Sequence, residues 1–107
     1  MNRTFETILE LVQNDQILIS EHGYDELVAD DIIVRDILAG VKNGIIVEDY
    51  PNYPKGPCVL PLQKDADGEP IHVVWGIPRG ESSPAVIVTA YRPDRQMWSA
   101  DFLRRKR

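Results

Sequence analysis

Three residues of this 107-residue sequence have the side chains best suited to acid-base catalysis: His22, His72 and Tyr91. Histidines that titrate near neutrality can act as a general base and a general acid, the two functions that cleavage of RNA requires. One imidazole would deprotonate a ribose 2′-hydroxyl, and the other would protonate the departing 5′-oxygen. The tyrosine would stack on a base or donate a proton. This chemistry needs no metal and no cofactor.

Positive charge for a phosphate group is available close to Tyr91, at Arg92 and Arg95. The net charge is -5, yet it is unevenly distributed. Residues 1–70 hold 5 basic and 14 acidic side chains, and residues 71–107 hold 7 basic and 3 acidic ones. Such an asymmetry can place a positive patch on an acidic protein. The basic tail, residues 104–107, either extends that patch or is a solubilising, frayed end.

The same side chains also fit purely structural roles or a metal site. A single histidine in a strand, such as His72, is often a structural residue, and Tyr91 and Trp75 fit a core or an interface as well as a base platform. His22, Asp25 and His72 would make a weaker metal site that lacks a further histidine or a cysteine ligand. The sequence contains no glycine-rich phosphate loop, nucleophile elbow or Cys-x-x-Cys pair.

The strands that must position His72 and Tyr91 are predicted at residues 71–77 and 85–91. Both runs are rich in β-branched and aromatic residues, and a Pro/Gly/Ser segment separates them, as in a hairpin with a long loop. Side chains alternate along a strand, so His72 points away from Ile71, Val73 and Trp75. If the polar faces of the two strands coincide, His72 and Tyr91 lie on one side of a small sheet. Two further strands are predicted at residues 45–50 and 58–62.

Helices are predicted in the first half of the chain. Apolar spacing indicates a helix over residues 5–14 with Thr4 as its N-cap, and Ser20 can cap a second helix that contains His22. A third, at residues 34–43, would be capped by Asp30 or Asp31. Residues 17–20 are either extended or the entry to the second helix, and a final helical turn is expected after Pro93. We therefore expect one α+β domain over residues 1–107, with N-terminal helices packed on a four-stranded antiparallel sheet.

Composition is that of an ordinary globular protein, with 43% hydrophobic and 27% charged residues. The single cysteine, Cys58, allows no intramolecular disulfide, which favours a reducing compartment. No apolar run approaches the ~20 residues that span a bilayer, and the N-terminus lacks the apolar segment of a secretory signal. A cytoplasmic protein without membrane association is the resulting expectation.

Four segments together resemble a small bacterial family of domains of unknown function. They are Ser20-Glu21-His22, residues 43–50 (NGIIVEDY), residues 68–74 (GEPIHVV) and residues 88–93 (VTAYRP). The resemblance covers about residues 17–94. That family is similar to the RelE-like and BrnT-like ribonuclease toxins of type II toxin-antitoxin systems, and its members look like neighbours of MqsA-like zinc-finger antitoxins.

The resemblance implies a RelE/barnase-like fold and a catalytic site at His22, His72 and Tyr91. It also implies RNA as the substrate, either free or bound to the ribosome, and a cognate antitoxin as the partner. Where relatives place an Arg-Met pair after the first histidine, this chain has Glu26-Leu27. A carboxylate there repels RNA phosphate, so either Arg92 or Arg95 supplies the positive charge or this copy has lost nuclease activity. The alternative function is a non-catalytic protein-interaction module, with an aromatic patch around Tyr50, Tyr53 and Trp75.

Overall fold

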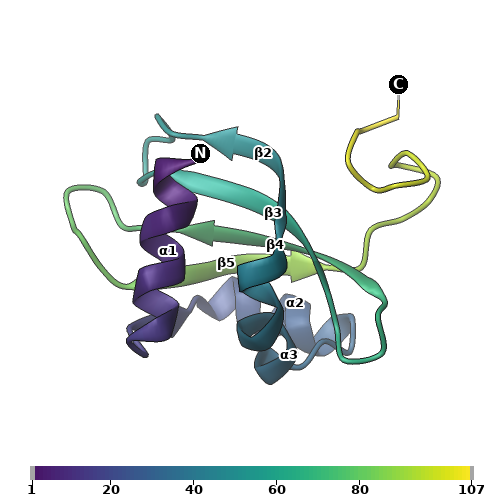
Figure 1. Ribbon diagram of the computed structural model, residues 1–107, viewed down its shortest axis with the longest axis horizontal. Helices are drawn as coiled ribbons and strands as arrows, with labels where there is room; N and C mark the ends of the chain where they lie inside the picture. Colours follow the sequence, from purple (N-terminus) through teal and green to yellow (C-terminus); the bar gives the residue numbers. More distant parts are fainter. Residues whose placement is uncertain (1, 107) are drawn as a thin grey trace.

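The fold is built on one five-stranded sheet, as seen in a computed structural model that describes residues 2–106 (Figure 1). The helices are α1 (Arg3–Gln13), α2 (Glu21–Ala29), α3 (Val34–Gly40) and the short 3-10 helix η1 (Val41–Asn43). The strands are β1 (Ile17–Ile19), β2 (Ile45–Tyr50), β3 (Cys58–Lys64), β4 (Pro70–Gly76) and β5 (Ala85–Tyr91). The α+β class and the four longer strands are thus as predicted.

Strand β1 lies in the segment that the sequence pattern left as either extended or the entry to a helix. It pairs in parallel with β5, from Ile17 opposite Ala85 to Ile19 opposite Ile87. The sheet order is β1-β5-β4-β3-β2, and the other neighbouring pairs are antiparallel. The expected four-stranded antiparallel sheet is therefore wrong: the sheet is mixed and has five strands. A three-residue strand carries too few residues to show a period, and its partner lies far along the chain.

The residues that cap the helices match the predicted caps only in part. Ser20 caps α2 as predicted, since its hydroxyl accepts a hydrogen bond from the Gly23 amide at 2.9 Å. Asn2, not Thr4, caps α1, and its side chain accepts from the Phe5 amide at 2.8 Å. Helix α3 begins after Ile33 without a side-chain cap. Asp30, expected as a possible cap of α3, instead ends α2.

The two faces of the sheet are covered by different parts of the chain. On one face, apolar side chains from α1, α2 and α3 pack on alternate residues of β4 and β5. This helix-side core contains Phe5, Ile8, Leu11, Leu27, Ile37, Val59, Ile71, Val73, Trp75 and Ile87. Gln63 is buried in the same layer, where it bonds the Ile37 carbonyl and the Trp75 indole. His72, Val74 and Tyr91 point to the opposite face, as strand alternation predicted.

The opposite face is covered by residues 98–106, which we call the C-terminal loop. Drawn in yellow in Figure 1, this segment follows the end of β5 and folds back on itself. Trp98 and Phe102 are buried there with Leu60, against Val74 and Tyr91. An isolated bridge joins Trp98 to Arg105. The helical turn predicted after Pro93 is limited to residues 94–98, where the Trp98 amide donates to the Asp94 carbonyl at 3.0 Å, and it does not continue through Phe102. The loop thus supplies a second, smaller apolar cluster.

None of the helices within residues 2–106 has the length and apolar character needed to cross a membrane.

Candidate functional site

His72 and Tyr91 form a hydrogen-bonded pair at the centre of the loop-covered face. They are register partners on β4 and β5, and His72 Nδ1 lies 3.1 Å from the Tyr91 hydroxyl. His72 Nε2 lies 2.9 Å from the carbonyl oxygen of Phe102 in the C-terminal loop. The Trp98 ring meets the imidazole edge to face, with ring centroids 4.4 Å apart. His72 is completely buried.

These contacts define the protonation state of His72. A carbonyl oxygen only accepts, so Nε2 must carry the proton that is donated to Phe102, and Nδ1 of the neutral ring accepts from the Tyr91 hydroxyl. Burial lowers the pKa of His72 from its ordinary value, although the Phe102 carbonyl and the charge of Glu48 oppose that shift. Burial also raises the pKa of Tyr91. At neutral pH both side chains are therefore uncharged in this arrangement.

Glu48 of β2 is the carboxylate on the same face, and it is not among the site residues predicted from the sequence, although it lies in the NGIIVEDY segment. Arg105 donates to it from Nε at 2.7 Å and from a terminal nitrogen at 3.1 Å, and the Tyr50 hydroxyl donates to it as well. The hydrogen bond from Arg105 lowers the pKa of Glu48, so the carboxylate is ionised at neutral pH. One face of the sheet thus carries an ionised carboxylate, an imidazole and two phenols.

A β-bulge explains how Glu48 reaches this face. Ile46 packs in the helix-side core, so simple alternation would place Glu48 there too. The register between β2 and β3 shifts between Ile46 and Glu48, which puts Glu48 opposite Leu60, on the loop-covered face. Two hints in the sequence are that Glu48 lies in the NGIIVEDY segment of the resemblance and that a carboxylate is costly in an apolar core.

His22 takes no part in this cluster. It lies on α2, with an exposed side chain, and its Nε2 is 3.8 Å from the carboxylate of Glu26 on the same helix. Helix α2 packs through Leu27 into the helix-side core, whereas His72 faces the other side of the sheet. The acid-base partnership of His22 with His72 that the sequence suggested is not formed. No local pattern indicates which side of the sheet α2 covers.

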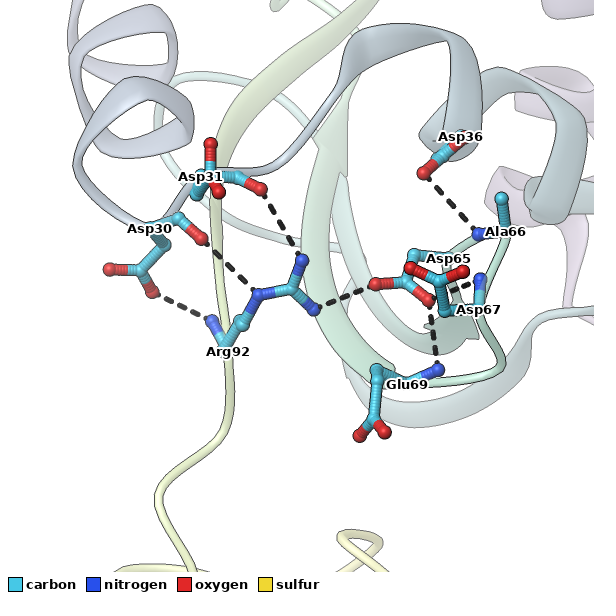
Figure 2. Close-up of polar contacts among 8 residues, drawn as sticks. All are labelled: Asp30, Asp31, Asp36, Asp65, Ala66, Asp67, Glu69 and Arg92. Atoms are coloured by element: carbon cyan, nitrogen blue, oxygen red, sulfur yellow. Dashed lines mark hydrogen bonds and ion pairs between the residues drawn. The ribbon is translucent and has the colours of Figure 1, made fainter.

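Arg92 ties three segments of the chain together (Figure 2). Its guanidinium lies 3.0 Å from the carboxylate of Asp65 and donates to the carbonyl oxygens of Asp30 and Asp31. Its amide donates to the Asp30 carboxylate. The Asp65 carboxylate also accepts from the amide of Glu69, which lowers the pKa of Asp65. Arg92 therefore joins the end of α2 to the β3–β4 turn, and each nitrogen of its guanidinium has one partner within the chain.

Arg95 packs on the C-terminal loop. Its guanidinium stacks over the Phe102 ring, 5.2 Å from the centroid. Arg92, Arg95 and Phe102 line a surface hollow of about 310 Å³ that also has Asp65, Asp67 and Glu69 in its wall. Of the basic tail, Arg105 pairs with Glu48, and Arg107 lies outside the described residues. Arg95 is thus an arginine at the edge of this face whose guanidinium forms no salt bridge with a carboxylate among residues 2–106.

The weaker metal-site hypothesis finds no support in this part of the chain. Within residues 2–106, His, Cys, Asp and Glu side chains form no group of three or more that could hold a metal ion. His22 and Asp25 are on α2, and His72 is buried on the other side of the sheet with both ring nitrogens bonded.

Comparison with protein families identifies the central part of the chain. A family described as a domain of unknown function, DUF4258, matches residues 19–92. The chain belongs to this family. The DUF4258 match includes Glu48, His72 and Tyr91 and ends before the C-terminal loop. Comparison with curated proteins finds no match, and neither does comparison with solved structures.

Proposed function

We propose that this chain is a toxin-like, metal-independent endoribonuclease domain of the RelE/barnase type. The observation that carries the proposal is the placement of Glu48, His72 and Tyr91 on one face of the sheet, with Arg95 at its edge. A carboxylate base, an imidazole acid and a guanidinium are sufficient to cleave RNA at a 2′-hydroxyl. Glu48 replaces His22 in the catalytic pair inferred from the sequence.

The spacing of Glu48 and His72 suits a phosphodiester between them. Glu48 is opposite Leu60 and His72 is opposite Leu62, on the two strands that flank β3. Ordinary strand spacing places their Cα atoms about 12 Å apart, with both side chains on one face. Side chains reaching inward from such positions can contact the two oxygens on either side of one phosphorus atom.

Each step of the proposed reaction uses a group of this cluster. The Glu48 carboxylate removes the proton of the 2′-hydroxyl, and the 2′-oxygen attacks the phosphorus atom. The bond to the 5′-oxygen breaks as His72 donates its Nε2 proton to that oxygen, which leaves a 2′,3′-cyclic phosphate and a 5′-hydroxyl. To act as an acid, His72 must first take up a proton on Nδ1. The resulting N–H group then donates a hydrogen bond to the Tyr91 oxygen. Tyr91 is thus a positioning residue, and Arg95 offsets charge on the phosphate.

Cleavage of a labelled RNA oligonucleotide in the presence of a chelator tests the proposal. We expect wild-type protein to produce 2′,3′-cyclic phosphate ends, and Glu48→Gln and His72→Gln to lose at least about 100-fold in rate, the scale of one general acid or base. Asp49→Asn is the matched control for Glu48, because Asp49 is the next, exposed carboxylate of the same strand. His22→Ala should retain full activity. Intact RNA with every folded variant, including variants of the C-terminal loop, would refute the proposal.

A non-catalytic protein-interaction module is the second candidate. The observation in its favour is that His72 is buried, with both ring nitrogens bonded within the chain. The aromatic patch predicted for this function is only partly exposed, since Tyr50 and Tyr53 reach the surface while Trp75 is in the core. Under the nuclease proposal a cognate antitoxin, of zinc-finger type by the resemblance, is the expected partner besides RNA. Under the second candidate the chain binds a protein and leaves RNA intact.

A further inference from the structure

The C-terminal loop is hydrogen-bonded to both reactive groups of the proposed site, His72 and Glu48. The Phe102 carbonyl accepts a hydrogen bond from His72 Nε2, whose proton is the one that the leaving 5′-oxygen would take. Arg105 is bonded to both oxygens of Glu48, which leaves the base paired with a cation. The Trp98 ring lies against the imidazole, where a nucleobase could otherwise stack. RNA cannot reach His72 while these contacts persist.

The loop has the construction of a unit that can move as a whole. It closes on itself through hydrogen bonds from the Ser99 amide to the Arg104 carbonyl and from the Arg104 amide to the Ser99 hydroxyl. The Asp101 carboxylate accepts from the Ser99 hydroxyl and from the Leu103 amide. The loop belongs to no strand of the sheet, and only the bridge between Trp98 and Arg105 relates it to strand geometry. These bonds hold the shape of the loop around Ser99, Asp101 and Arg104 from within.

Phe102, whose carbonyl contacts His72, has an unfavourable backbone conformation. Its φ is 62°, in the left-handed region that a bulky side chain rarely adopts. Such a conformation persists only where surrounding contacts impose it. Here those contacts are the hydrogen bond to His72, the packing on Leu60 and the Arg95 side chain over the ring. Together with the hydrogen bond from the Phe102 amide to the Ser99 carbonyl, these contacts hold Phe102 in a costly conformation in the closed position.

We propose that the C-terminal loop, residues 98–106, is an autoinhibitory cover that blocks the RNA site by seating the Phe102 carbonyl on His72 and Arg105 on Glu48. This inference rests on the proposed nuclease function and specifies how that site is regulated. The DUF4258 match, residues 19–92, contains Glu48, His72 and Tyr91 but not the loop. Activity then requires the loop to leave the sheet.

A matched pair of full-length variants tests the cover. Arg105→Glu reverses the charge that faces Glu48 and removes the cation over the Trp98 ring, 4.8 Å from its centroid. Arg104→Glu makes the same change of charge one residue earlier, at an exposed side chain outside the Glu48 contact. Both variants repel RNA equally by bulk charge, so a difference between them reports on the loop. Arg105→Ala and Arg104→Ala serve as the pair if Arg105→Glu does not fold.

Two readouts separate the cover from the chemistry. The first is acylation of His72 by diethylpyrocarbonate, measured by mass spectrometry, with exposed His22 as the internal reference. The second is cleavage of an RNA oligonucleotide. We expect Arg105→Glu to exceed Arg104→Glu by about ten-fold in both rates, the factor that corresponds to weakening the closed state by about 1.4 kcal/mol.

The outcomes distinguish the two proposals. Equal acylation of His72 in both folded variants would overturn the cover. A wild type that already cleaves RNA through His72 as fast as Arg105→Glu would also overturn it, while leaving the nuclease function intact. Faster acylation of His72 without cleavage by any variant would refute the nuclease function and with it the inhibitory purpose of the loop.

Discussion

Replacing His72 with leucine should destabilise the protein far more than the same change at His22. The substitution removes the hydrogen bonds to the Phe102 carbonyl and from the Tyr91 hydroxyl. Leaving the buried carbonyl unpaired costs about 1–3 kcal/mol. Loss of the edge-to-face contact with Trp98 adds about 0.5–1.5 kcal/mol. Leucine offsets part of this through its own burial, so we expect the free energy of unfolding to fall by about 1–4 kcal/mol.

His22→Leu is the matched control, since the His22 side chain is exposed and its Nε2 lies 3.8 Å from the Glu26 carboxylate. A surface change of this kind alters stability by no more than about 0.5 kcal/mol. Urea unfolding followed by far-ultraviolet circular dichroism measures both variants, with the slope of the transition as a check on two-state behaviour. Equal stability of the two leucine variants would refute the assignment of His72 as a buried, doubly bonded residue.

Three further predictions concern the fold that holds the site. Gln63→Leu should cost about 2–5 kcal/mol, because it leaves the Trp75 indole and a helix carbonyl unpaired in the core; an unchanged urea midpoint would contradict this. Gly56→Ala should lower the melting temperature much more than Gly68→Ala. Both glycines have positive φ, but a Cβ at Gly56 would lie 2.0 Å from a carbonyl oxygen, whereas a Cβ at Gly68 would have no atom within 4 Å. Stability should also fall on acidification below pH ~6.5, because the unfolded chain binds a proton at His72 that the folded chain, with its lowered pKa, does not. His72→Leu should flatten that part of the pH profile and leave the loss below pH ~4, where carboxylates are protonated; an unchanged profile would contradict the shift.

Strand periodicity is enough to predict one half of the candidate site. Alternation places His72 on the other face of the strand from Ile71 and Val73. The pairing of two adjacent strands then brings His72 beside Tyr91. Both inferences use neighbours in sequence or consecutive strands, for which local pattern is informative. The N-cap at Ser20 is predictable for the same reason, because the capping contact spans only three residues.

The other half depends on contacts that no local pattern encodes. Glu48 reaches the site through a β-bulge that reverses its face, and Arg105 meets it from the C-terminal loop. The pairing of β1 with β5 depends on which distant segment lies at the sheet edge. Chemical type alone groups His22 with His72, and the packing of α2 separates them. Long-range packing thus decides which of the predicted residues can act together.

The central claim, that the loop-covered face of the sheet cleaves RNA, is tested most directly by the RNA of cells in which the chain is induced. Wild type and His72→Gln would be expressed in a bacterial host at matched soluble levels, with growth followed and the ends of total RNA analysed. We predict growth arrest and RNA fragments ending in 2′,3′-cyclic phosphate for wild type, and normal growth with intact RNA for His72→Gln. Intact RNA in both cultures and in a third that expresses the loop variant Arg105→Glu, from protein shown to be folded, would contradict the claim and favour the interaction module.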